Sequence, residues 1–160
     1  MLTITKDSRG LDKLIKQLRA MSDAEVQVGW FEEHRYGEDN ENLAMAQVAQ
    51  WQEEGRRGTA TSGPIPERPF MREGMRTAFK NGANKEDFHK VIKAVVQGKS
   101  VLTAMKSITD DLEETMKRVM EAWDDPPNAA MTIAEKGFDD PLIHTRQLIN
   151  NVTAKVSKSE

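Results

Sequence analysis

One long amphipathic stretch, from Ser100 to about Trp123, sets the strongest limit on what this chain can fold into. Apolar residues recur there every three or four positions, the spacing of one face of an α-helix. Ser100 is of a type that caps helix N-termini, and Asp124-Asp125-Pro126-Pro127 ends the pattern abruptly. The stripe consists of Val101, Met105, Ile108, Leu112, Met116, Val119 and Trp123. We therefore expect one long helix that packs across a small sheet.

Shorter segments repeat the helical spacing on both sides of this stretch. Capping residues, glycines and prolines at their ends predict where each helix starts and stops. The expected helices cover about 9–21, a segment capped by Asp39 or Asn40 and ending at Gly55, a segment entered through Pro69 and ending at Asn81-Gly82, about 85–97, and a segment from an Asn128 cap to Lys136 that Gly137 closes.

Two segments alternate apolar and polar residues, as half-buried strands do. Val26, Val28 and Trp30 form the apolar side of the first. The second runs from Val152 to Val156, and we expect it to pair with the first. A further short alternation, Leu2 with Ile4, predicts one more strand. The predicted fold class is α+β, a small antiparallel sheet packed against several helices.

Length and composition favour a single domain over residues 1–160 with a binding or structural role. Only 38% of residues are hydrophobic and the mean hydropathy is -0.66, so much of the surface is wet or awaits a partner. A net charge of -3 argues against bulk electrostatic binding of nucleic acid. Cysteine is absent, which excludes disulfides and thiolate metal sites. With no secretory signal and no long apolar run, we expect a soluble intracellular product and no membrane contact.

Residues 55–69 contain three glycines and three prolines and follow neither regular period, which predicts a long exposed loop. Loops of this length are commonly binding elements or flexible segments, so residues 55–68 are the first candidate contact surface. The basic pair Arg56-Arg57 in this loop suits phosphate or an acidic partner surface, since guanidinium groups bind either. The candidate contact residues are Arg56, Arg57, Thr59, Thr61, Ser62 and Arg68. A loop tip that only aids solubility is the alternative.

No pattern in the chain points to catalysis. His34, His89 and His144 lie in separate contexts without metal-ligand spacing. Gly98-Lys99-Ser100 resembles the end of a phosphate loop, but Lys93 stands where the required glycine would be. We expect no enzyme activity, no cofactor, no metal and no small-molecule substrate.

Three blocks of sequence are distinctive in their order and spacing. The first is Val26-Gln27-Val28-Gly29-Trp30, and the second joins 46–55 to Ile65-Pro66-Glu67-Arg68-Pro69-Phe70-Met71-Arg72. The third runs from Pro126-Pro127-Asn128 through Thr132-Ile133 and Lys136-Gly137 to Pro141-Leu142-Ile143-His144-Thr145-Arg146-Gln147-Leu148. Together they resemble the tail-completion or neck proteins of long-tailed bacteriophages, a family that includes minor tail proteins of the Z type.

The resemblance implies a structural virion protein that completes the tail or joins head to tail. Its partners would be other neck and tail proteins, in a homo-oligomeric ring around the DNA path, without sequence-specific binding to that DNA. The protein would assemble in the host cytoplasm and remain in the virion neck. Many relatives have glycine at the position of Arg146. The motif residues carried over are Gly29, Pro66, Arg68, Pro69, Phe70, Pro141, Leu142, Thr145, Gln147 and Leu148.

The motif residues also have a purely structural interpretation. Pro66 and Pro69 fix φ and aim Phe70 into a core at a helix entry. Thr145 and Gln147 would satisfy backbone groups at a turn, while Leu142, Ile143 and Leu148 anchor it.

Two other functions stay open from the sequence. A nucleic-acid-binding module would use Arg56, Arg57, Arg68, Arg72 and Arg76, and its binding would weaken as salt rises. An assembly adaptor or chaperone would form a soluble complex and be absent from finished particles.

Overall fold

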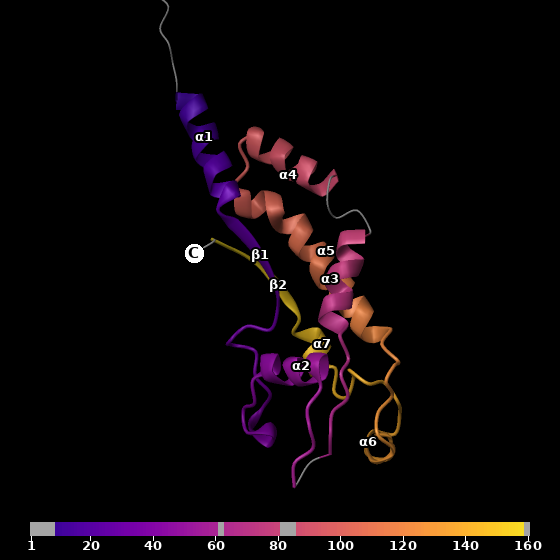
Figure 1. Ribbon diagram of the computed structural model, residues 1–160. Coiled ribbons are helices and arrows are strands. Elements are labelled where there is room, and N and C mark those ends of the chain that lie inside the picture. Colours follow the sequence, from indigo (N-terminus) through magenta and orange to yellow (C-terminus); the bar gives the residue numbers. More distant parts are fainter. Residues whose placement is uncertain (1–8, 61–62, 81–85, 159–160) are drawn as a thin grey trace, which may run out of the picture.

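The computed structural model describes residues 9–60, 63–80 and 86–158 and confirms an α+β fold (Figure 1). Seven α-helices in the described residues pack around one two-stranded antiparallel sheet. The strand expected at Leu2 to Ile4 lies outside the described residues. The elements are α1 (Arg9–Ser22), β1 (Ala24–Gly29), a 3-10 turn η1 (Glu38–Asn40), α2 (Met45–Glu54), α3 (Phe70–Lys80), α4 (Glu86–Val96), α5 (Val101–Glu121), α6 (Ala130–Lys136), α7 (Gln147–Asn150) and β2 (Thr153–Lys158).

Helix α5 carries the core, as its long apolar stripe predicts. Ser100 caps it by accepting a hydrogen bond from the Thr103 amide at 3.2 Å. One end of α5 packs with α4 and the sheet, and its other end packs with α3, α7 and the segments near Trp30 (Figure 1). Six of the eight buried residues of α5 divide between two hydrophobic clusters, so this one helix joins both halves of the molecule.

The predicted pairing of the two strands is confirmed. β1 and β2 run antiparallel with Val26 opposite Val156 and Val28 opposite Ala154. These residues share one face of the sheet, because side chains alternate along a strand, and they pack against the cluster on α5. Glu25 and Gln27 lie on the opposite, exposed face.

Two predicted helix starts are wrong. Asp39 and Asn40 lie in the η1 turn, and α2 begins only at Met45, after the extended residue Ala44. Glu41 and Asn42 both have φ of 53°, a left-handed conformation that ends a right-handed helix. The N-cap of α6 is Ala129 rather than Asn128, whose amide instead donates to Asp139. Gly137 closes α6 with φ of 82°, as predicted.

Helix α1 has the predicted boundaries but no buried residue. Met21 packs against the cluster on α5, and the Gln17 amide donates to the Lys99 carbonyl at 3.1 Å. Leu11 is 61% exposed, and Ile15 and Leu18 are exposed as well. Only one edge of the apolar stripe of α1 therefore faces the rest of the protein.

The sequence predicts a long exposed loop at 55–68, but part of this segment forms regular main-chain pairing. Arg56 and Ile65 form an antiparallel bridge in which each amide donates to the other carbonyl at 2.8 Å. The bridge closes a stem, and the described residues between its two sides are exposed. Gly55, where the stem leaves α2, has φ of 73°.

Substituting Gly55 with alanine should destabilise the protein by about 1–3 kcal/mol. A Cβ atom there would lie 2.9 Å from the Glu67 amide nitrogen and 3.0 Å from the Ile65 carbonyl oxygen, both backbone atoms. Gly63→Ala is the matched control, since a Cβ at Gly63 meets nothing within 4 Å. Urea unfolding of both variants measures the difference, and equal stability would contradict this account of the stem.

Candidate interaction site

The three sequence blocks meet at the side chain of Trp30. Its ring packs edge-on against Phe70, with the centroids 6.0 Å apart and the planes at 70°. Its indole N–H donates to the Leu148 carbonyl at 2.7 Å. Phe70 is fully buried and Trp30 and Leu148 are nearly so. One residue of each block therefore contributes to a single buried contact, which we call the Trp30 junction.

Arg68 forms a second link between two of the blocks. Its guanidinium donates to Gln52 Oε1 at 2.7 Å, to the Pro126 carbonyl at 2.9 Å and to the Pro127 carbonyl at 3.0 Å. Burial lowers the pKa of Arg68 from its usual value, and the nearby Asp139 carboxylate opposes that shift. The side chain remains charged, because an arginine pKa lies far above neutral pH.

The prediction that Arg68 is an exposed contact residue is wrong. Arg68 is only 3% exposed, so it is not part of an accessible loop surface. Pro66 and Pro69 restrict the chain on either side of it, and the Arg68 amide donates to the Gln52 carbonyl at 2.7 Å. The structure gives Arg68 the structural role that the motif also allowed.

Glu53, at the end of α2, caps the N-terminus of α3, although it lies 18 residues before Met71 in the sequence. Its carboxylate accepts the Met71 amide at 2.7 Å and the Arg72 side-chain Nε at 2.9 Å. The first amides of a helix have no partner within the helix. This carboxylate accepts two of them, from Met71 and, at 3.3 Å, from Arg72. Hydrogen bonds from Glu53 and from Glu67 raise the pKa of Arg72.

The end of the third block is half buried and half exposed. Leu142, Ile143 and Leu148 are buried, which agrees with their predicted anchoring role, and Pro141 is buried beside them. Thr145 and Gln147 are exposed, and within the described chain neither side chain makes a hydrogen bond. The expectation that these two side chains satisfy the turn is therefore wrong.

Arg146 has φ of 61°, which a glycine adopts without steric cost. This conformation accounts for the glycine that the resemblance places there. The Arg146 side chain pairs with Glu121 at the end of α5. Gly29, by contrast, has φ of 149° and a methionine side chain, Met71, at 3.7 Å from where its Cβ would be.

The remaining predicted contact residues separate by position. The Arg56 guanidinium lies over the Trp51 ring at 4.5 Å, whereas Arg57 and Thr59 are exposed. Thr61 and Ser62 lie outside the described residues. Of the arginines that a nucleic-acid site would use, Arg68 is buried, and Arg72 and Arg76 form ion pairs with glutamates. The arginine set does not form one open cationic surface.

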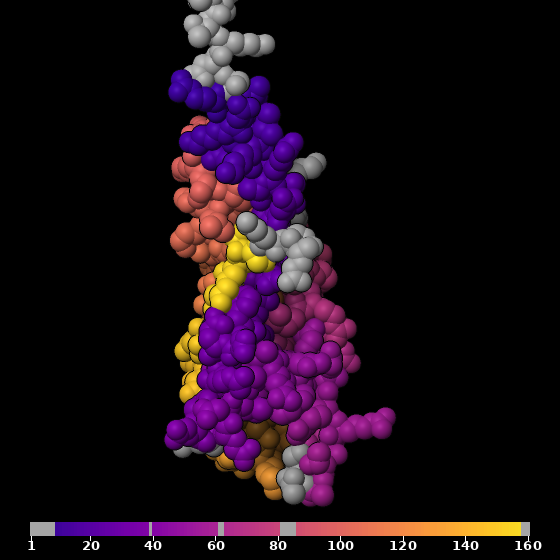
Figure 2. All heavy atoms as spheres, turned by 90° about the vertical axis from the view of Figure 1, so that its left-hand side faces the viewer, coloured from indigo at the N-terminus to yellow at the C-terminus, as the bar shows by residue number. Residues whose placement is uncertain are grey.

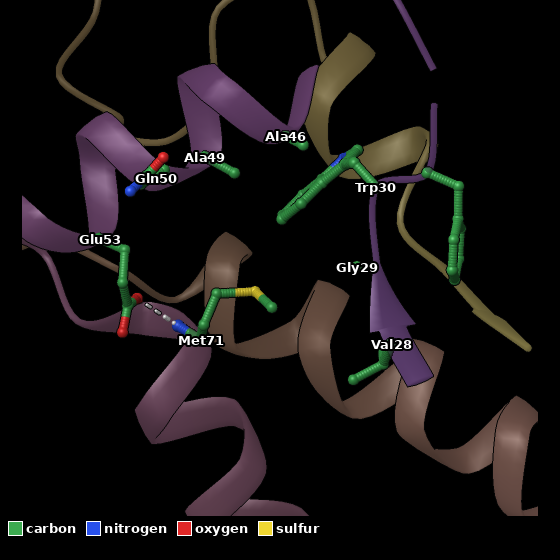
Figure 3. A pocket seen from close by; sticks show the side chains of 9 residues that line it. Val28, Gly29, Trp30, Ala46, Ala49, Gln50, Glu53 and Met71 are labelled. Atoms are coloured by element: carbon green, nitrogen blue, oxygen red, sulfur yellow. Dashed lines mark hydrogen bonds between the residues drawn. The ribbon is translucent and has the colours of Figure 1, made fainter. Parts of the chain in front are cut away.

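Sequence reasoning missed a pocket of about 280 Å³ beside the end of β1 (Figure 3). Its apolar lining includes Trp30, Ala46, Ala49 and Met71. Glu53 lies at one end, where its carboxylate holds the Met71 amide (Figure 3). The small residues at 46 and 49, on one face of α2, were the only sequence signal for this hollow.

A wider groove of about 460 Å³ lies between α2 and the end of the third block. Polar and apolar side chains both line it, among them Tyr36, Gln52, Lys136 and His144. In the part of the chain that the structure describes, no three His, Asp or Glu side chains are placed to share a metal ion. No described helix is long and apolar enough to cross a membrane.

Comparison of the chain with protein-family models, with curated proteins and with solved structures gave no match.

Replacing Arg68 with alanine should lower the free energy of unfolding by about 2–4 kcal/mol, because Gln52 and two carbonyl oxygens then lose their buried donor. Arg68→Lys should recover only part of this loss, since an ammonium cannot reproduce the planar fork. Arg57→Ala, at an exposed arginine of the same segment, should change stability by less than about 0.5 kcal/mol. Chemical denaturation measures all three. If Arg68→Ala were as stable as Arg57→Ala, the structural role of Arg68 would be refuted.

Replacing Glu53 with alanine should cost about 1 kcal/mol, the usual value of a lost helix cap. Glu53→Gln should cost less, because its amide oxygen still accepts a backbone hydrogen bond. Glu54→Ala is the control, since Glu54 is an exposed residue of the same helix. Thermal unfolding distinguishes the variants, and an equal effect at Glu53 and Glu54 would contradict the capping role.

Proposed function

We propose that this chain is a structural protein of a bacteriophage neck, which completes the tail or joins head to tail as one copy in a ring. The observation that carries the proposal is the Trp30 junction. Each of the three blocks that resemble neck proteins contributes one residue to it, and Arg68 joins two of the blocks again. Blocks that depend on one another in space support a resemblance more strongly than separate short motifs.

The exposed surfaces also suit assembly with neighbours. The stem closed by Arg56 and Ile65 holds the described loop residues 57–60, 63 and 64 away from the core, and Arg57 and Thr59 are exposed there. Figure 2 shows the described part of this loop at one end of the molecule. An exposed loop binds a neighbouring protein when the contact repays the conformational entropy that binding costs. We assign residues 57–64 to contact with the adjacent subunit or with another neck protein.

The loop can be tested without disturbing Arg68. Residues 57–64 are replaced by Asn-Gly, which forms a two-residue hairpin turn between strand positions paired like Arg56 and Ile65. The variant should unfold at the same temperature as the natural chain, because the stem and the Arg68 contacts remain. In complementation of a phage genome that lacks the gene, it should leave unjoined heads and tails.

Electron microscopy of the complementation lysates gives the answer. Gly63→Ala is the control variant and should support normal joining, since it retains the loop. A folded Asn-Gly variant that joins heads to tails in normal yield would refute the role of the loop.

A further inference from the structure

Among the described residues, strand β1 pairs with β2 on one side only. A hydrogen bond of β2 shows which main-chain N–H and C=O groups of β1 point away from β2. The Ala154 amide donates to Glu113 Oε1 at 2.7 Å, so the main chain at Ala154 points away from β1. Antiparallel pairs alternate between residues that face each other and residues that face outward. Because Val28 is paired with Ala154, the N–H and C=O of Val28 also point outward. The same holds at Val26 and Ala24, two and four residues earlier.

The two edges of this sheet are not equivalent. At the outer edge of β2, the Glu113 carboxylate of α5 accepts the hydrogen bond of the Ala154 amide. At the outer edge of β1, the main-chain groups of Ala24, Val26 and Val28 have no hydrogen-bond partner among the described residues. Proteins commonly protect such an edge with lysine, proline or a bulge, and β1 has none of these. Within the described residues, these main-chain groups of β1 are therefore available to another strand.

The pocket beside β1 continues this open edge. Val28 and Gly29 form one wall of the pocket, and Trp30, Ala49 and Met71 provide apolar lining. In Figure 3 the pocket lies on the side of β1 that faces α2 and α3, and β2 lies on the other side. Its volume of about 280 Å³ is enough for one large apolar side chain. An added strand would thus gain main-chain hydrogen bonds and one side-chain pocket, the two elements of strand-addition binding.

We propose that the edge of β1 and this pocket bind an extended segment of another protein as a third strand. The chemistry of the segment follows from the two faces of the sheet. Residues on the side of Val26 must be apolar, with one large side chain for the pocket. A cationic residue fits best opposite Glu25, because Glu25 is exposed, forms no ion pair with a described residue, and opposite charges on facing strands attract.

This surface adds a second contact to the proposed neck function, but its test uses the isolated protein and does not depend on particles. The probe is the peptide Thr-Val-Lys-Val-Lys-Leu-Thr with blocked ends, which carries valine and leucine on one face and lysine on the other. Two matched peptides serve as controls. One has both lysines replaced by glutamate, and the other has its central valine replaced by proline.

Amide hydrogen exchange, followed by NMR, measures the protection of each backbone amide of β1. In the free protein the Val26 and Val28 amides should exchange faster than the Glu25 and Gln27 amides, which face β2. The lysine peptide should slow Val26 and Val28 by about tenfold or more and leave Glu25 and Gln27 nearly unchanged. The glutamate and proline peptides should protect them less.

Two variants test the chemistry of the segment. Glu25→Lys should reverse the preference from the lysine peptide to the glutamate peptide, whereas Glu54→Lys, on the exposed side of α2, should not. Ala46→Leu should partly fill the pocket and weaken binding of the lysine peptide, whose leucine is the side chain meant for the pocket.

Three results would overturn the proposal. The peptide could protect no outward amide, or protect Val26 and Gln27 equally. Alternatively, Val26 and Val28 could already be protected in the free protein at the mass of a dimer, which would mean that a second copy covers the edge.

Discussion

The buried contact between Trp30 and Phe70 is the interaction on which the rest of the structure depends. Trp30 follows the end of β1, and Phe70 begins α3, so their contact fixes the sheet against the helix that packs along α5. The indole N–H bond to Leu148 then holds the C-terminal segment that leads into β2. A large apolar ring with one polar atom can do both, because burial of the ring requires a partner for its N–H.

Polar groups complete this junction from outside. Arg68 holds the turn at Pro126 and Pro127, and Glu53 holds the first amides of α3. Both side chains act on backbone groups that have no partner within a helix or strand. The charges of these two residues therefore serve the fold, and neither residue belongs to the loop surface or the strand edge that we propose as contacts.

Periodicity predicted the parts of the fold that depend on apolar spacing. The long helix, its Ser100 cap, both paired strands and the α+β class all follow from local pattern. The false starts at Asp39 and Asn128 have separate reasons. Asn128 lies one residue before the actual cap, Ala129, and its backbone amide donates to Asp139. At Asp39 the backbone that follows is the cause. A capping residue type marks a helix only if the following backbone is right-handed, and Glu41 and Asn42 adopt left-handed conformations that no pattern encodes.

The site was harder to predict than the fold. Arg68 looked like a loop residue because its three acceptors, on Gln52, Pro126 and Pro127, come from distant parts of the sequence. The open edge of β1 could not be seen either, since it depends on which strands pair and on where Glu113 points. Short-range patterns report on burial, whereas these features arise from long-range contacts.

The function that we propose requires this polypeptide to supply shape and contact surface to a viral particle and to stay in it after assembly is complete. Quantitative mass spectrometry of purified infectious particles tests this most directly. We predict that the chain is present in every preparation, in a fixed ratio to the tail proteins and resistant to salt washing. Infectious particles that contain none of it would contradict the account.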